Sequence, residues 1–485
     1  MEQVNLKQNA IKGAVWTSVE KIVRQLIIFV IGIILARLID PEEFGIIGMI
    51  SIFIAISQTF ADSGLSSALI QKKDRTNTDC STIFYYNLGV SVFFYVILFF
   101  TAPLIAEFYK TPLIKQIIRV VAFSIVLTSL SAVQGTRLTI DLKFKEQSLV
   151  SILSALISGL SGVTLAYLGF GVWALVAQTL INQVCITIGF WFFSKWFPSK
   201  EFSKDSFKQL WKFGSKLLGS GLINTLYSNL YTLVIGKAFT AAEVGYYNRA
   251  NQFVSFPVDT VQSMAVKVNY PVLSKLQDDD SKLVGAYKKL LSTPLYVLYP
   301  ALTGLALVAE PLVQILIGSK WLPCVPYLQI LAIGYMFTPL TTINLNLLYV
   351  KGRTDIVLKL ELIKKPIAFA ILIASIPFGI KCMVIGKALY EFIAFSFNCY
   401  YTGKFLGYGE LKQLRELLPT WIYCAIMASV VLYVMKLCPT NATKLIAGTI
   451  SGIITYIVVS VVAKDSNYYE LKEALINLLK SKFKK

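Results

Sequence analysis

Long apolar runs alternate with short polar segments along the whole chain, and most of the runs are about 20 residues long. A helix of about 20 apolar residues crosses the roughly 30 Å hydrocarbon core of a bilayer, and it satisfies its own backbone groups there. The pattern therefore predicts an all-α integral membrane protein with about 14 transmembrane helices. The predicted spans are 13–37, 43–62, 82–104, 116–134, 147–168, 172–194, 213–236, 249–270, 290–310, 325–350, 356–378, 383–403, 417–437 and 444–463.

Two short markers occur twice and in the same order. Glu-Phe-Gly at 43–45 follows the first predicted span, and Glu-Val-Gly at 243–245 follows the seventh. Phe-Gly-Val at 170–172 joins the fifth and sixth spans, and Phe-Gly-Ile at 378–380 joins the eleventh and twelfth. The recurrence predicts two six-helix bundles, related by a pseudo-two-fold axis along the membrane normal, with two extra C-terminal helices. Chance similarity among short turns between hydrophobic helices is the alternative.

This repeat divides the chain into five predicted parts. They are an N-terminal six-helix lobe (1–197), an amphipathic cytoplasmic linker (198–212), a C-terminal six-helix lobe (213–405), two appended transmembrane helices (406–463) and a basic amphipathic cytoplasmic tail (464–485). Ser203 is the expected cap of a helix in the linker. Linker and tail have the composition of helices that lie on a membrane surface and attract anionic lipid, although a solvated positive segment explains them equally well.

The charge distribution predicts the orientation. The chain has 46 Lys and Arg against 27 Asp and Glu, a net charge of +19, yet only 15% of its residues are charged. Most basic residues outside the spans fall in the loops on the side of the two termini, and positive loops stay cytoplasmic. Both termini are therefore predicted to be cytoplasmic, and this bias explains much of the net charge without a nucleic-acid partner.

Several kinds of chemistry are excluded by what the sequence lacks. There is no histidine, the seven cysteines form no CxxC motif, and Gly-Lys-Ser/Thr does not occur. His-based metal sites, Ser-His or Cys-His catalysis and a P-loop are excluded on these grounds. We expect no enzymatic activity, no metal and no cofactor, and we interpret the cysteines as packing residues. An ion gradient or binding energy must then drive the protein.

Ionisable residues inside the predicted spans are the candidates for function, because they are costly in lipid unless they face protein or water. In the first span Lys12, Trp16, Glu20 and Arg24 recur every four residues and share one helix face. Similar stripes follow in the seventh and eighth spans, and the eleventh carries Lys359, Glu361, Lys364 and Lys365. Basic groups outnumber acidic ones, which suits a bound phosphate or pyrophosphate. Snorkelling, or internal pairing such as Glu361 with Lys365, is the structural alternative.

Three stretches resemble a known family. They are YPVLSKLQDDDSKL (270–283), LARLIDPEEFGIIGM (35–49) and GKAFTAAEVGYYNRANQF (236–253). They are similar to bacterial polysaccharide exporters, the Wzx-type lipid-linked oligosaccharide flippases, especially the colanic-acid-exporter-like branch of the multidrug/oligosaccharidyl-lipid/polysaccharide (MOP) superfamily. The resemblance implies a V-shaped, MATE-like fold in the bacterial cytoplasmic membrane. It also implies that alternating access moves undecaprenyl-pyrophosphate-linked oligosaccharide to the outer leaflet, for assembly of lipopolysaccharide or exopolysaccharide.

Related flippases have a cationic central cavity, and position along the chain suggests which residues take each role here. The resemblance assigns pyrophosphate binding to Arg24, Lys216, Arg249, Lys359, Lys364 and Lys365. The polar and aromatic residues expected to contact sugars are Trp16, Ser220, Asn224, Tyr227 and Gln252. Return of the empty protein would use H⁺ or Na⁺ at a carboxylate, and the candidates are Glu20, Asp259, Glu361 and Glu391.

Two other functions stay open at this point. A MATE-like cation or drug antiporter would need an acidic, aromatic cavity, whereas the predicted stripes are lysine-rich. A membrane glycosyltransferase or ligase would need carboxylates outside the membrane, where Asp40, Glu42 and Glu43 are the candidate cluster. The same three acids also suit an ordinary helix start. Whether a polysaccharide polymerase or a chain-length regulator docks on the protein is not visible in the sequence.

Overall fold

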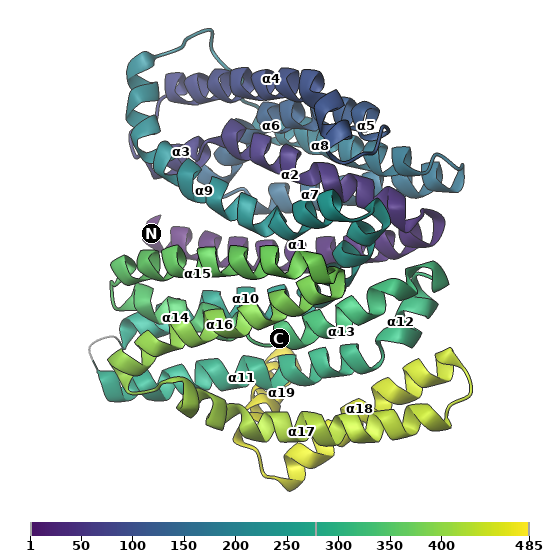
Figure 1. Ribbon diagram of the computed structural model, residues 1–485. Coiled ribbons are helices and arrows are strands. Elements are labelled where there is room, and N and C mark those ends of the chain that lie inside the picture. The colour runs from purple at the N-terminus through teal and green to yellow at the C-terminus, as the bar shows by residue number, and fades with distance from the viewer. Residues whose placement is uncertain (1, 277–278, 484–485) are drawn as a thin grey trace. The chain divides into compact units, whose positions relative to one another are not determined.

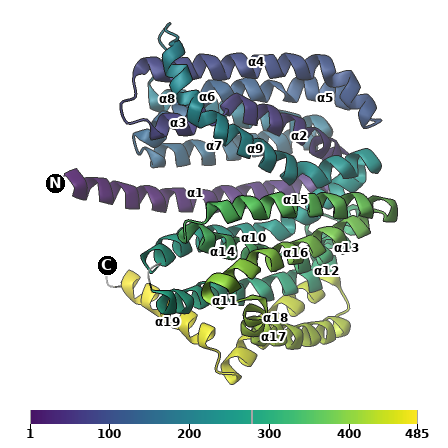
Figure 2. The same ribbon diagram turned by 60° about the vertical axis from the view of Figure 1, so that its left-hand side comes forward.

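The structure is a computed structural model that describes residues 2–276 and 279–483, and every regular element in this part of the chain is a helix. The chain divides into two compact units, Met1–Gly245 and Tyr246–Lys485. Figures 1 and 2 show each unit built from long helices that run side by side. The expected all-α class is confirmed.

The first unit contains nine helices and the start of a tenth. They are α1 (Glu2–Leu38), α2 (Pro41–Asp62), α3 (Leu65–Gln71), α4 (Asn77–Phe108), α5 (Ile114–Val121), α6 (Phe123–Ile140), α7 (Phe144–Tyr167), α8 (Val172–Ser194) and α9 (Lys204–Ala238), followed by the first residues of α10 (Ala241–Lys275). Helix α7 packs against α1 and α8, α6 packs against α4 and α8, and α9 packs against α2, α3 and α4.

The second unit contains most of α10 and the remaining helices. These are α11 (Asp280–Leu307), α12 (Ala309–Leu316), the 3₁₀ helix η1 (Ser319–Cys324), α13 (Val325–Gly334), α14 (Thr338–Val350), α15 (Thr354–Ser375), the 3₁₀ helix η2 (Ile376–Phe378), α16 (Ile380–Leu406), α17 (Glu410–Leu437), α18 (Asn441–Val462) and α19 (Ser466–Phe483). Helix α16 packs against α13, α14 and α15, whereas α17 packs against α11 and α18.

Nine helical segments within the described residues are long and apolar enough to cross a membrane. They do not include α1, α9, α10, α15 and α16, where polar and charged side chains interrupt the apolar sequence. These are the helices of the first, seventh, eighth, eleventh and twelfth predicted spans, so most of the residues with proposed roles in transport lie on them. The protein is a multi-pass membrane protein, while the total of 14 spans stays a prediction.

The second pair of markers has a common backbone conformation. Gly171 is the N-cap of α8 with φ 53°, and Gly379 is the N-cap of α16 with φ 86°. Positive φ at these ψ values is accessible to glycine and strained for other residues. Both turns therefore require glycine at the same place, directly before a long helix.

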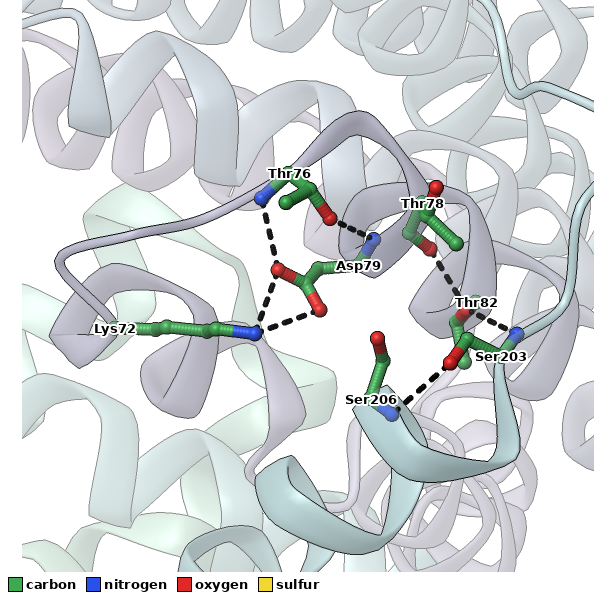
Figure 3. Close-up of polar contacts among 7 residues, drawn as sticks. All are labelled: Lys72, Thr76, Thr78, Asp79, Thr82, Ser203 and Ser206. Carbon is green, nitrogen blue, oxygen red and sulfur yellow. Dashed lines mark hydrogen bonds and ion pairs between the residues drawn. The ribbon is translucent and has the colours of Figure 1, made fainter.

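The linker between the predicted lobes is held on the first unit. The Ser203 hydroxyl caps α9 by accepting from the Ser206 N–H, as expected, and the Ser203 N–H donates to the Thr82 hydroxyl of α4 (3.1 Å). Upstream, the Ser199 N–H donates to the Ser81 hydroxyl (2.9 Å). Helix α9 then continues without a break through the predicted boundary at 212, because no helix-breaking residue lies there. Figure 3 shows this junction.

A buried ion pair lies beside the linker. The Asp79 carboxylate is inaccessible to solvent, accepts from the Thr76 N–H (2.8 Å) and pairs with the Lys72 ammonium (2.8 Å). Figure 3 shows that Lys72 and Thr76 approach Asp79 from the loop before α4, with Ser206 of α9 on the other side. The loop before α4 and the start of α9, which are far apart in sequence, thus meet at one carboxylate.

The two appended helices are anchored in the second unit by polar side chains. Asn344 of α14 and Gln413 of α17 exchange two amide hydrogen bonds (3.0 and 3.1 Å), and both side chains are buried. The Tyr456 hydroxyl of α18 donates to the Tyr296 carbonyl of α11 (2.7 Å). The following helix, α19, is linked to α11 by the Lys289–Glu470 ion pair (2.6 Å).

The segment 270–283 is described except for Gln277 and Asp278, which lie outside the described residues. Asp279 caps α11 by accepting from the Lys282 N–H (3.1 Å). Hydrogen bonds from the Ser281 hydroxyl and from Lys282 hold the pKa of the exposed Asp279 well below its usual range. This part of the segment thus starts a helix.

Candidate functional site

The stripe on α1 is exposed on the first unit. Trp16 and Arg24 are exposed and Glu20 is half-buried. The Lys145 ammonium of α7 lies 5.9 Å from the centre of the Trp16 ring. The helix thus presents an aromatic ring, a carboxylate and a guanidinium along one face, as its four-residue spacing predicts.

Arg24 lines a polar pocket of about 270 Å³ within the first unit. The opposite wall comes from α8, which contributes Gln178, Asn182 and Gln183, and Ser158 of α7 adds a hydroxyl. Amide and hydroxyl groups can bind sugar hydroxyls or phosphate oxygens, and the guanidinium supplies the positive charge. Sequence reasoning missed the three α8 residues. The sequence does contain one indication of them: Gln178 and Asn182 are polar residues four positions apart inside an apolar span, so they share one helix face.

The stripe on α9 is likewise exposed. Lys216, Ser220 and Asn224 are all exposed, and Tyr227 is half-buried. Successive turns of the helix carry Lys216, Ser220 and Asn224 on a face that does not pack into the core of the first unit. They are therefore accessible to a ligand, as the role that we predicted for them requires.

A second polar pocket of the first unit lies next to α9, between α2, α4 and α6, and has a volume of about 610 Å³. Its walls include Gln58 and Asp62 of α2 and a hydroxyl pair, Thr59 with Thr225 (3.0 Å). The fully buried Asn87 amide also lines it, and neither polar atom of that amide has a hydrogen-bond partner in the described chain. Buried amides are normally satisfied, so this pocket has unused capacity for a polar ligand or water.

Arg249 is buried in the second unit. Its Nη1 donates to the Gln252 side-chain oxygen (2.8 Å), and the guanidinium lies 5.2 Å from the centre of the Trp321 ring. The sequence predicted this arginine near the end of a span, free to bind pyrophosphate. The structure places it among protein groups, so a ligand would have to replace contacts that already stabilise it.

The basic residues of α15 separate into two groups. Lys364 is buried and pairs with Glu361 (2.7 Å), and Lys365 lies 3.4 Å from the same carboxylate. The internal pairing of Glu361 that we considered as the alternative is therefore observed. Lys359 lies elsewhere, in a groove that Lys404 also lines.

Lys387 and Glu391 belong to a half-buried polar cluster of the second unit. The Lys387 ammonium donates to the hydroxyls of Tyr247 (2.8 Å) and Tyr335 (2.8 Å) and to the Asn251 side-chain oxygen (3.2 Å). One turn along α16, the Glu391 carboxylate accepts from the Thr338 hydroxyl (3.0 Å).

Glu391 thus differs from the other carboxylates predicted to couple transport to an ion. Asp259 is exposed, Glu361 is paired with two lysines, and Glu20 lies on the accessible α1 stripe. The four-residue spacing of Lys387 and Glu391 is visible in the sequence, whereas their neighbours Tyr247, Asn251 and Tyr335 are not, because these come from α10 and the α13–α14 junction.

One residue of the acidic cluster at 40–43, Glu43, has a structural role. The Glu43 carboxylate accepts from the Val172 N–H at the start of α8 (3.0 Å) and from the Asp40 N–H (3.3 Å). It therefore satisfies backbone donors at two helix starts. These contacts favour the helix-start interpretation over a catalytic one.

Comparison with known proteins identifies the family. Residues 34–326 match the family described as "Polysaccharide biosynthesis protein". The chain belongs to this family. The expected resemblance to bacterial polysaccharide exporters is thereby confirmed, with support from individual relatives.

Two curated relatives are similar over about three quarters of their length. The lipopolysaccharide biosynthesis protein WzxC of Escherichia coli (strain K12) is 27% identical over 367 residues, 74% of each chain. The teichuronic acid biosynthesis protein TuaB of Bacillus subtilis (strain 168) is 28% identical over 360 residues, 73% of each chain. A third, the succinoglycan biosynthesis transport protein ExoT of Rhizobium meliloti (strain 1021), is 27% identical over 67% of this chain and 65% of its own.

Solved structures show the same fold at low sequence identity. The lipid II flippase MurJ in an inward closed conformation has a TM-score of 0.76 and 16% identity, covering 94% of this chain and 99% of its own. An inward-facing MATE family multidrug transporter of the MOP superfamily has a TM-score of 0.61 and 14% identity, covering 79% and 95%. The fold is therefore that of MOP transporters.

Proposed function

We propose that this protein is a flippase that moves undecaprenyl-pyrophosphate-linked oligosaccharide repeat units from the inner to the outer leaflet of the bacterial cytoplasmic membrane. The observation that carries the proposal is the combination of family and fold. The family is that of polysaccharide biosynthesis, and the fold matches a lipid II flippase over 94% of the chain. A lipid-linked saccharide is a substrate that suits both a polysaccharide biosynthesis pathway and a lipid II flippase.

The exposed stripes of the first unit are the proposed contacts for the substrate headgroup. Arg24 and Lys216 are exposed cations, and polar pockets that could accept sugar hydroxyls adjoin both α1 and α9. A pyrophosphate diester carries two negative charges, and a guanidinium or ammonium that binds it forms a charge-assisted hydrogen bond. Trp16 offers a flat apolar face for a sugar ring, while Ser220 and Asn224 offer polar groups. Arg249 and Lys364 of the second unit are weaker candidates for binding the headgroup, because other protein groups already contact them.

Glu391 is the proposed coupling carboxylate. Glu391 is half-buried one helical turn from the half-buried Lys387 ammonium, and protonation of this carboxylate would remove its attraction to Lys387. Such a change can bias a transporter between two conformations if the two states hold the proton with different affinity. We propose that proton binding at Glu391 drives the return of the empty protein.

Reconstitution tests the proposed function. Purified protein in proteoliposomes should move a fluorescent undecaprenyl-pyrophosphate oligosaccharide to the opposite leaflet, where a membrane-impermeant quencher measures its exposure. Vesicles without protein are the control. No protein-dependent movement, together with exchange of an organic cation for protons, would replace the flippase by an antiporter.

A further inference from the structure

A groove on the second unit is separate from the polar pockets described above. It lies between the first half of α15, the last turns of α16 and the start of α17, and has a volume of about 970 Å³. All its lining residues belong to one unit, since they fall between Lys359 and Lys412. The groove combines a basic rim with an apolar wall.

Three lysines line the basic rim: Lys359, Lys404 and Lys412. The Lys412 ammonium donates to the Gly407 carbonyl (2.6 Å). Neither Lys359 nor Lys404 has a hydrogen-bond or ion-pair partner among the residues that the structure describes. One carboxylate, Glu410, also lines the groove and accepts from the Ser396 hydroxyl (2.8 Å). The rim is therefore net positive and has two cations available to a ligand.

The wall of the groove is apolar and open. Leu360 and Ile363 of α15 face Phe397 and Tyr400 of α16, and Leu411 closes one end. Tyr400 is 66% exposed and Leu411 is 83% exposed. Large apolar side chains with such exposure next to lysines are typical of the zone where lipid headgroups meet acyl chains, in which tyrosine is also enriched.

The predicted topology places this groove at the cytoplasmic membrane surface, because the loops at 351–353 and 407–409 are on the side of the termini. We propose that the groove binds an anionic phospholipid of the cytoplasmic leaflet, with the phosphate on Lys359 and Lys404 and an acyl chain along the exposed Ile363 and Tyr400 side chains. Basic pockets between transmembrane helices on this side suit anionic headgroups. Charge complementarity selects the anion, and the apolar wall selects a ligand that has a hydrophobic chain. Lys359 then serves a lipid site instead of the transported headgroup.

Lipid binding to the purified full-length protein tests the proposal by native mass spectrometry. The titrants are phosphatidylglycerol and, with the same acyl chains, zwitterionic phosphatidylethanolamine. The test variant is Lys359→Gln/Lys404→Gln. The matched control Lys73→Gln/Lys275→Gln removes two exposed lysines from other segments on the same predicted side. Both lysines of the groove lie at the surface, so the test variant should fold.

We expect phosphatidylglycerol to bind more tightly than phosphatidylethanolamine to the wild type and to the control variant. The dissociation constant should rise about fivefold for each lysine of the groove and about thirtyfold for the pair. An equal affinity of the test and control variants would overturn the site. Equal competition by inorganic pyrophosphate would show a free-anion site, and preferential binding of undecaprenyl phosphate would show a carrier-lipid site. Either result would overturn the assignment to a phospholipid. The measurement does not involve transport, so its failure leaves the proposed flippase activity unaffected.

Discussion

Gly45 and Gly245, the glycines of the first repeated marker, lie against each other's helix start. A Cβ atom added to Gly45 would lie 1.7 Å from the Ala241 carbonyl oxygen, and one added to Gly245 would lie 2.1 Å from the Pro41 carbonyl oxygen. Each glycine thus lets its own helix approach the first turn of the other. The reciprocal contact gives a physical reason for the repeated sequence, and it is what a duplicated unit would produce. The pseudo-two-fold axis itself stays a proposal.

Replacing either glycine by alanine should strongly destabilise the protein. The added methyl group collides with backbone atoms, which cannot move aside as a flexible side chain can, and overpacking of this kind costs about 3 kcal/mol. The free energy of unfolding in detergent measures the effect. Gly89→Ala is the control, because a Cβ atom at Gly89 meets nothing within 4 Å. Equal stability of Gly45→Ala and Gly89→Ala would show that the two helix starts are not in close contact.

The Lys72–Asp79 ion pair should be important for the stability of the first unit. Asp79→Asn leaves the largely buried Lys72 ammonium without a counter-charge, a change that costs about 3 kcal/mol. The double variant Lys72→Met/Asp79→Asn should be less destabilised, since no unpaired charge remains. Asp355→Asn is the matched control, because its pair with Arg353 (2.7 Å) is exposed to solvent and should contribute much less to stability. Equal losses at Asp79 and Asp355 would contradict this account.

The Asn344–Gln413 amide pair should connect the appended helices to the second unit. Gln413→Leu leaves the buried Asn344 amide without its partner, and this should destabilise the protein by about 2 kcal/mol. Replacing both residues by leucine should recover part of the loss, because neither amide is then left without the other, and the remaining loss comes from the Tyr408 carbonyl, which accepts from Gln413 (3.1 Å). Thermal unfolding of the single and double variants measures the coupling. Additive losses in the double variant would argue against a direct interaction.

Glu391 should determine how transport responds to a proton gradient. In proteoliposomes with an imposed pH difference, Glu391→Gln should abolish the stimulation of glycan movement, since the neutral side chain no longer binds a proton. Asp259→Asn serves as the comparison, because Asp259 is an exposed carboxylate on a different helix, α10. Stimulation that persists in Glu391→Gln and disappears in Asp259→Asn would reverse this assignment. Stimulation by sodium alone would exclude the proton.

The helices could be predicted from the sequence because an apolar segment long enough to cross a bilayer must form a helix there to satisfy its backbone groups. The positive-φ glycines at 171 and 379 could be anticipated from the repeated marker, as could the Ser203 cap. The continuity of α9 could not be anticipated, since the lysines at 208 and 212 indicated a surface segment. Nothing in the local sequence shows that a basic amphipathic turn continues into a membrane helix.

The candidate site was predicted less completely, because partners come from distant helices. Arg24 was found by its spacing, whereas the amides of α8 that share its pocket lie more than 150 residues away. Lys359 and Lys364 are close in sequence yet have different surroundings, since they project from different faces of α15. Spacing identifies a helix face, and tertiary packing decides what that face meets.

The most direct test compares charge-removing variants in the transbilayer movement of undecaprenyl-pyrophosphate oligosaccharide. Arg24→Ala and Lys216→Ala should each slow movement about tenfold or more, since each removes a charge-assisted contact to the pyrophosphate. Lys200→Ala, which removes an exposed lysine from the linker, should move the glycan at the wild-type rate. Wild-type rates in both cavity variants would contradict the proposed headgroup site, and no movement by the wild-type protein would contradict the flippase function itself.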